Sequence, residues 1–412
     1  MALLALPLAV LGRVVSSTEA ASAARAWARE GAHLGARVGE VVESVSAQYT
    51  TNDAPFFVVK MSGGGTVFTA GDTEVAPIVA FTASAEDFST LDPKSPVWAL
   101  LNRDLSSRTR VRVSPAARNA QPKRALLALS SSAALAAAEE LRASPNANER
   151  AWGELLAADA NSGKRLMAAP KNSIGDVCVA PLVQSKWSQS THNDYRSGKA
   201  TYNFCTPQTN VPDANGIYTV TNDGVHNAVC GCVATAMSQL MRYHKYPDIP
   251  VTNSLTHTCW FDATKIKITM QGGLYDWDMM TLEPSTDPSL TEDNRRAIGK
   301  ITSDAGISVN MQYTLDDSGS FLSDACAALR STFHFGQAYF YCLSWDGSAG
   351  STTMFNDTML NKAVFANFDA GFPVLFGITG AGGHAIVGDG YGYDGGDAFV
   401  HLNFGWSGSS DM

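Results

Sequence analysis

Two cysteines separated by one residue are the first candidates for chemistry in this chain. Cys230 and Cys232 lie in the stretch VCGCVATAM, and from Cys232 apolar residues recur at helical spacing until Pro247. The sequence therefore predicts that Cys232 begins a helix with an apolar core face. Unpaired amides and the helix dipole favour an anion at such a position, so we expect the pKa of Cys232 to be lowered toward that of a reactive thiolate.

A reactive thiolate needs a partner that keeps it ionised and later protonates the leaving group. Histidine suits both tasks near neutral pH, and the chain has eight histidines. His384 stands out because it follows a glycine-rich run and opens an apolar strand, so that a rigid element would present its imidazole. His244 lies on the helix of Cys232 but three turns away from it. A lone histidine at a strand start is more often structural, so this signal is weak by itself.

Other interpretations of the cysteines stay open at this stage. All seven lie after residue 170, and they would serve equally well as small buried hydrophobic side chains. A zinc site built from His226, Cys230 and Cys232 would need Cys259 as a fourth ligand from a remote loop. A disulfide between Cys230 and Cys232 would be strained by its small loop. We expect no metal and no cofactor.

Composition predicts a globular chain with more than one domain. The chain has 412 residues, of which 45% are hydrophobic and 17% charged, and one domain typically takes roughly 150 residues. The formal charge of −9, without a cluster of Lys and Arg among aromatic residues, argues against a nucleic-acid partner. No apolar run reaches the roughly 18 residues of a membrane span. The patterns GxSxG, GxxxxGK[ST] and HExxH are absent, which disfavours their chemistries.

Three segments are expected along the chain: a possible signal peptide over residues 1–20, an N-terminal domain over 21–172 and a second domain over 173–412. The stretch MALLALPLAVLG has the apolar character of a secretory signal, although no basic residues precede it. We therefore expect a secreted or periplasmic protein. The second domain is marked by a change in composition, because cysteine, tryptophan and abundant glycine appear after a basic stretch near residue 164.

Periodicity predicts the main elements of both domains. In the N-terminal domain it indicates a helix over residues 18–48, glycine-separated strands over 55–84 and helices over 122–167, broken near residue 145. In the second domain it indicates a helix from Cys232. Three final strands are expected in PVLFGIT, HAIVGDGY and AFVHLNF.

Three blocks taken together resemble the signature segments of the streptopain family, secreted papain-like cysteine peptidases of bacteria. They are GCVATAMSQLMRYHKYP (231–247), GGHAIVGDGY (382–391) and HLNFGWSG (401–408). VAPLVQSKWSQS (179–190) also resembles the start of the mature enzyme, and residues 18 to about 110 resemble its propeptide. The resemblance implies an α+β, papain-like fold, with a nucleophile-bearing helix packed on an antiparallel sheet. A small α+β propeptide domain would precede it.

The resemblance also implies roles for five residues. Cys232 would be the nucleophile and His384 the general acid/base. Gln189 would help the backbone N–H of Cys232 to form an oxyanion hole, and one donor of that kind lowers the barrier by ~3 kcal/mol. Asn403 and Trp406 lie in the block that packs against the catalytic histidine, and we favour Trp406 over Asn403 as the residue that orients it.

The function implied by the resemblance is that of a secreted cysteine endopeptidase made as a zymogen. Its partners would be protein or peptide substrates and its own propeptide, acting as an intramolecular inhibitor. One alternative is a catalytically silent papain-like binding or inhibitor module, which would not need the intact pair of Cys232 and His384. Another alternative keeps this chemistry but transfers the acyl group to an amine, and the sequence does not separate it from hydrolysis.

The chain departs from the family pattern at two places. It has Phe404 where relatives often carry Trp, an aromatic exchange that should preserve packing. It stops at Met412 where the family usually continues through a further strand, which would leave a sheet edge unpaired.

Overall fold

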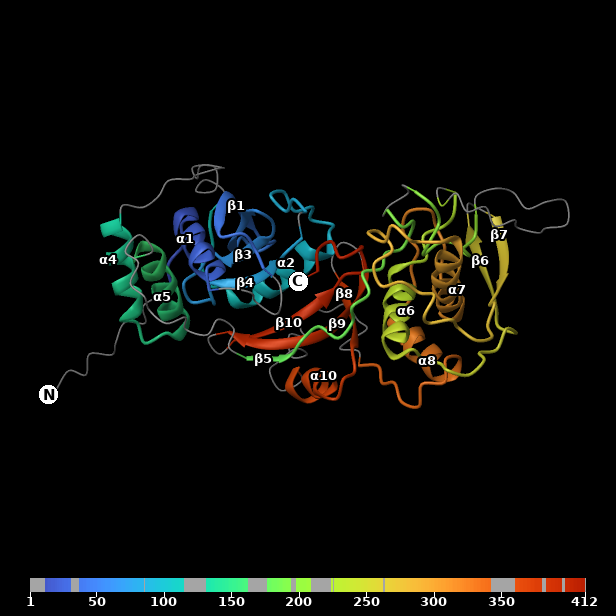
Figure 1. Ribbon diagram of the computed structural model, residues 1–412. Coiled ribbons are helices and arrows are strands. Elements are labelled where there is room, and N and C mark those ends of the chain that lie inside the picture. Colours follow the sequence, from blue (N-terminus) through green and yellow to red (C-terminus); the bar gives the residue numbers. More distant parts are fainter. Residues whose placement is uncertain are drawn as a thin grey trace.

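The structure is a computed structural model of the chain (Figure 1). It describes residues 12–30, 37–84, 86–114, 131–161, 176–193, 198–208, 224, 226–261, 264–341, 360–379, 383–394 and 397–411.

A four-stranded antiparallel sheet forms the centre of the N-terminal part. Its strands pair in chain order: β1 (Val41–Tyr49), β2 (Pro55–Ser62), β3 (Thr66–Ala70) and β4 (Ile78–Thr82). The helices of this part are α1 (Ser17–Ala28), α2 (Pro96–Arg108), α4 (Ser131–Arg142) and α5 (Ala147–Asn161). Helix α1 packs on the sheet, α5 packs on α1, and α4 packs on α5 (Figure 1). Consecutive buried residues in β2 and β3 show that both faces of the sheet are covered.

The helix expected over residues 18–48 is wrong in its second half. Helix α1 ends at Ala28, and the later valines belong to β1, where Val45 lies opposite Val59 of β2. Valine favours a paired strand, because its branched side chain packs well on a pleated surface. Helix α2 (Pro96–Arg108) was not predicted from the sequence.

The strands expected over residues 55–84 are confirmed by β2, β3 and β4. The expected break near residue 145 is confirmed by the gap between α4 and α5. Residues 122–130 and 162–167 of the expected helices lie outside the described residues.

The start of the N-terminal domain is packed from residue 13 onward. Ser16 caps α1 in a reciprocal capping box with Glu19, and Arg13 pairs with Glu19 at 2.6 Å. Val15 and Ala20 are fully buried. Packing therefore begins before the expected boundary at residue 21, while residues 1–11 lie outside the described residues. The signal peptide stays a prediction.

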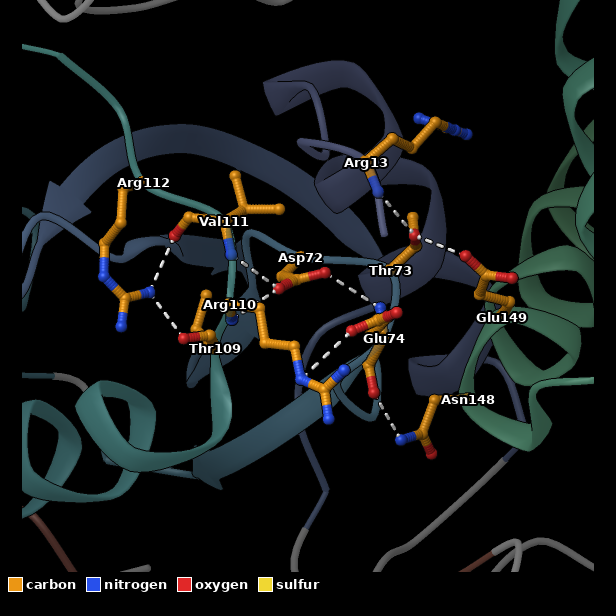
Figure 2. A network of polar contacts seen from close by, with 10 residues as sticks. All are labelled: Arg13, Asp72, Thr73, Glu74, Thr109, Arg110, Val111, Arg112, Asn148 and Glu149. Atoms are coloured by element: carbon orange, nitrogen blue, oxygen red, sulfur yellow. Dashed lines mark hydrogen bonds and ion pairs between the residues drawn. The ribbon is translucent and has the colours of Figure 1, made fainter. Parts of the chain in front are cut away.

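A fully buried carboxylate, Asp72, joins separate segments of this domain (Figure 2). It accepts hydrogen bonds from the backbone N–H groups of Glu74, Arg110 and Val111 at 2.9–3.0 Å. Next to it, the Thr73 hydroxyl donates to a carboxylate of α5 at 3.1 Å. These bonds replace the water that burial removes and tie the turn after β3 to the segment after α2 and to α5.

A second antiparallel sheet contains β5 (Asp176–Val179), β8 (Val374–Thr379), β9 (Gly383–Asp394) and β10 (Asp397–Asn403). Strand β9 is central, because β10 pairs along one edge while β8 and β5 pair along the other. Among the described residues, β10 lies at the edge of the sheet. The three strands expected at the end of the chain are therefore confirmed.

The remaining elements form a helical layer and a hairpin. They are α6 (Cys232–His244), α7 (Glu292–Ser308), α8 (Leu322–Ser331), β6 (Thr256–Phe261), β7 (Thr264–Thr269), η1 (Leu360–Phe365) and α10 (Ala366–Asp369). Helix α6 begins at Cys232 as predicted, and residues 233–241 are buried. In the described part of the chain, no helix combines the length and the apolar character that crossing a membrane requires.

The sheet around β9 lies between the N-terminal domain and α6 (Figure 1). Side chains alternate along a strand, so Ala385 and Val387 join the core that contains α6, whereas Ile386 joins the core of the N-terminal domain. Phe81 of β4 packs against Phe399 of β10 with ring centroids 6.3 Å apart. The predicted α+β class is confirmed, with the helix of Cys232 packed on an antiparallel sheet.

The Asp72 network predicts that Asp72→Asn destabilises the N-terminal domain by about 1–3 kcal/mol, because the amide directs N–H groups at buried donors and leaves at least one unsatisfied. The measurement is thermal unfolding of the full chain. Asp104→Asn removes an exposed helix pair with Arg108 and serves as the control, with little expected effect. Equal melting temperatures for both variants would contradict the importance of the network.

Candidate active site

Cys232 is the first residue of α6 and is partly buried. Gly231 before it has φ +89°, and a Cβ there would lie 2.7 Å from both the Met311 sulfur and the Ser318 carbonyl oxygen. Only glycine permits this backbone and this close approach. On the other side, the backbone N–H of Ala385 in β9 lies near enough to the Cys232 sulfur to lower the pKa of its thiol. The nucleophile candidate therefore contacts the residue that directly follows His384.

The groups around Cys232 have opposing effects on the pKa of its thiol. Burial raises the pKa of its thiol, the backbone N–H groups of Ala385 and Val233 lower it, and the carboxylate of Asp317 raises it. The net pKa is raised, so the expected net lowering is wrong in this arrangement. The amide at the helix start does favour the anion as predicted, but desolvation of the thiolate has the larger effect.

Cys230 has different surroundings from Cys232. It is fully buried, its sulfur lies 3.2 Å from the Thr235 hydroxyl, and burial raises the pKa of its thiol to about 12. Neither cysteine forms a disulfide. His226 is exposed, and the described ranges contain no group of three His, Cys, Asp or Glu side chains that could hold a metal ion.

His384 is the second residue of β9 and is buried, with 8% of its surface exposed. Its Nε2 lies 2.9 Å from the carbonyl oxygen of Phe404. A carbonyl only accepts, so Nε2 carries the proton and Nδ1 is the nitrogen left for proton exchange. The Trp406 ring stacks on the imidazole at 4.7 Å. Burial lowers the pKa of His384, whereas the Phe404 carbonyl and the Asp317 carboxylate raise it.

No hydrogen bond joins the Cys232 sulfur to the imidazole of His384 among the described residues. Along β9, His384 has the same parity as Ile386, which faces the N-terminal domain. Its ring packs against Trp406, which itself contacts the N-terminal core. The structure therefore brings Cys232 against the backbone of β9 and holds the imidazole on the Trp406 side.

Gln189 lies beside the start of α6. Its backbone carbonyl accepts a hydrogen bond from the backbone N–H of Cys230 at 2.8 Å, two residues before Cys232. The next stretch of helix also holds this segment, since the Thr235 hydroxyl donates to the Ser188 carbonyl at 3.1 Å. Within the described ranges, the side-chain amide of Gln189 forms no hydrogen bond. Its donors are therefore available to a ligand.

Asn403 and Trp406 have different positions relative to the imidazole. Trp406 stacks directly on His384, as expected for the favoured residue. Asn403 does not contact the imidazole and instead hydrogen-bonds Gln239 of α6 at 3.0 Å and the Ser185 carbonyl at 2.9 Å. The role of each residue stays a prediction.

Three features of the site were missed in the sequence. Asp317 acts on the pKa of both Cys232 and His384, but it lies in a turn that carries no recognisable pattern. The Phe404 carbonyl is a backbone group, so no residue type in the sequence indicates its role. Gln239 had a signal, because a glutamine that interrupts the apolar face of a helix is a candidate for a buried polar contact.

Comparisons with known proteins match the chain to a peptidase family model and to two proteases. The family model described as Peptidase C10 family matches residues 197–412. The chain is 31% identical over 189 residues to thiol protease/hemagglutinin PrtT of Porphyromonas gingivalis, and 29% identical over 191 residues to streptopain of Streptococcus pyogenes. Each match covers 45% of this chain. The matched regions span 20% of PrtT and 45% of streptopain, less than half of either relative.

A solved structure shares the fold of nearly the whole chain. It is a fragment of prointerpain A from Prevotella intermedia, which is 20% identical, with a TM-score of 0.53. The match covers 89% of this chain and 90% of the fragment, so the N-terminal domain is included. The papain-like fold implied by the sequence is thus confirmed. Because the family match extends over more than half of the sequence, this chain belongs to the Peptidase C10 family.

Proposed function

We propose that this chain is a cysteine endopeptidase made as a zymogen, with Cys232 as nucleophile and His384 as general acid/base. The observation that carries the proposal is the position of Cys232, at the start of α6 and in contact with the residue that follows His384. Membership of the Peptidase C10 family supports peptide hydrolysis as the reaction. The substrates would be proteins or peptides.

In the proposed cycle, the Cys232 thiolate forms a bond to the carbonyl carbon of the substrate. The backbone N–H of Cys232 and the side-chain amide of Gln189 stabilise the oxyanion, each by ~3 kcal/mol. Protonated His384 gives its Nδ1 proton to the leaving amine as the C–N bond breaks. Water, deprotonated by the imidazole, then cleaves the thioester and regenerates the thiol.

The N-terminal domain would be the inhibitory propeptide. Its core includes Ile386 and Phe404, the neighbours of His384, and it contacts Trp406. With this domain docked, burial favours the neutral thiol and the neutral imidazole, and no hydrogen bond joins them. Removal of the domain would free the imidazole side of β9. We also propose export to the periplasm or the medium, which the apolar stretch at residues 1–12 supports.

A second candidate is a papain-like binding module without catalysis. The observation that favours it is the same neutral pair, since a silent protein needs neither a thiolate nor an imidazolium. Hydrolysis of a peptide substrate would support the peptidase, and its absence would support the binding module.

The two cysteines of VCGCVATAM give the first test. Cys232→Ala should abolish peptidase activity, because the nucleophile is lost. Cys230→Ala should retain activity and lower the melting temperature slightly, because Cys230 is a fully buried neighbour. The measurement is hydrolysis of a denatured protein substrate under reducing conditions. Equal loss in both variants would instead indicate a joint role for the two thiols.

Self-processing gives a second test. Under mild reduction, the intact mass of the unmutated chain should fall over time by the mass of the segment that ends near residue 172. The Cys232→Ala chain should keep its full mass, because cleavage requires the nucleophile. Identical clipping of both chains would point to a contaminating protease and would contradict self-activation.

Removal of the Asp317 carboxylate is expected to change the pH dependence of activity. This exposed residue lies in a turn whose Thr314 carbonyl accepts from the backbone N–H of Val229, and its carboxylate raises the pKa of both Cys232 and His384. Asp317→Asn should therefore lower both pKa values. The thiolate–imidazolium pair exists between the two pKa values only when the pKa of Cys232 lies below that of His384, which we expect once the N-terminal domain has been removed. In the processed enzyme the pH window of this pair should therefore move to lower pH.

The measurement is the pH profile of kcat/KM. Asp316→Asn is the matched control, because Asp316 is the exposed neighbour and does not act on either pKa. An unchanged or upward-shifted profile in Asp317→Asn would contradict the electrostatic role of Asp317.

A further inference from the structure

We propose that Gln239 is a positioning residue, which fixes both loops of the candidate active site relative to the helix of Cys232. The inference rests on the proposed function, because positioning matters only if Cys232 and His384 perform chemistry. Gln239 lies two turns after Cys232 on α6 and is fully buried. A primary amide has two donor hydrogens and an acceptor oxygen, so one such group can hold two segments.

The oxygen of this amide holds the segment that leads to Gln189. Oε1 of Gln239 accepts from the Ser185 hydroxyl at 3.0 Å and from the backbone N–H of Trp187 at 3.3 Å. Two residues later, the Gln189 carbonyl accepts from the backbone N–H of Cys230. The segment of the oxyanion donor is therefore fixed to α6 at one end and to the residues just before α6 at the other.

The nitrogen of the same amide holds the loop after β10. Nε2 of Gln239 donates to Oδ1 of Asn403 at 3.0 Å, and that oxygen also accepts from the backbone N–H of Gly405 at 3.0 Å. Between these two residues lies Phe404, whose carbonyl accepts from Nε2 of His384. The loop that orients the imidazole is thus connected to the nucleophile helix through Gln239.

The three side chains form a closed, buried network. Nδ2 of Asn403 donates to the Ser185 carbonyl at 2.9 Å, which completes the connection between the two loops. Gln239, Asn403 and Ser185 are each no more than 2% exposed. Loss of one member leaves buried donors and acceptors unpaired, so the loops would shift. A shift of about 1 Å in a catalytic geometry can lower the rate about 100-fold.

The test uses the full chain with Gln239→Met, which keeps the side-chain length and removes both hydrogen-bonding functions. The rate of Cys232 alkylation by iodoacetamide is measured by peptide mass mapping from about pH 5 to about pH 9, before and after any loss of the N-terminal domain. In the processed chain we expect alkylation below neutral pH to slow about tenfold or more, because a misplaced imidazole no longer pairs with the thiolate. In processed chains kcat should fall while KM is nearly unchanged.

Two variants of α6 separate positioning from stability. Ser238 is the fully buried neighbour of Gln239, and its hydroxyl forms no hydrogen bond within the described ranges, so Ser238→Ala should retain the unmutated pH profile. Met241→Ala removes buried packing from the same helix outside the network. It should lower the melting temperature without changing the pH profile of alkylation.

Asn403→Asp covers the case in which Gln239→Met does not fold. It keeps the acceptor for Gln239 and loses the donor to the Ser185 carbonyl, and it should slow alkylation below neutral pH in the same way. If the Gln239 and Asn403 variants that fold show the same pH profile of Cys232 alkylation as the unmutated chain, the network has only a structural role. If Cys232 of the processed, unmutated chain reacts no faster than a small free thiol, the proposed function itself fails, and the inference fails with it.

Discussion

Strand β9 is buried on both faces, and the rest of this structure depends on that constraint. Its residues from His384 to Gly392 are all buried. Because side chains alternate, one face of the strand must complete the core of α6 and the other must complete the core of the N-terminal domain. Ala385 therefore meets the helix of Cys232, while Ile386 meets the preceding domain. Docking of the N-terminal domain and the position of His384 are thus parts of the same packing problem.

The electrostatics of the site follow from this burial. The start of α6 provides amides that favour a thiolate, and the Phe404 carbonyl favours a protonated imidazole. Desolvation acts in the opposite direction on both groups and is the largest influence on each pKa. The site of the full chain is therefore built for an ion pair but holds the neutral forms. If the proposed function holds, removal of the N-terminal domain would increase reactivity by exposing groups that are already in place.

Two buried polar networks organise the two domains in similar ways. In the N-terminal domain, Asp72 accepts from three backbone N–H groups and joins the turn after β3 to the segment after α2. In the second domain, Gln239 and Asn403 join the helix of Cys232 to its two neighbouring loops. In both cases a short side chain satisfies groups from segments far apart in the sequence. Such contacts give a single geometry, since their alternatives leave buried groups unpaired.

The sequence by itself determined most elements of the second domain and named the candidate residues for chemistry. Local patterns sufficed for the helix that starts at Cys232 and for the three final strands, because helical and strand periodicities are short-range properties. The α+β class followed from the resemblance of three sequence blocks to a known family. The helix expected over residues 18–48 failed where β1 pairs with β2, since strand pairing depends on a partner elsewhere in the chain. Only the tertiary structure decided the raised pKa of Cys232, the stacking of Trp406 on His384 and the contacts of Gln239. Burial, ring contacts and shared hydrogen bonds arise between separate segments, as far apart as the 218 residues between Ser185 and Asn403. Local periodicity carries no information about them.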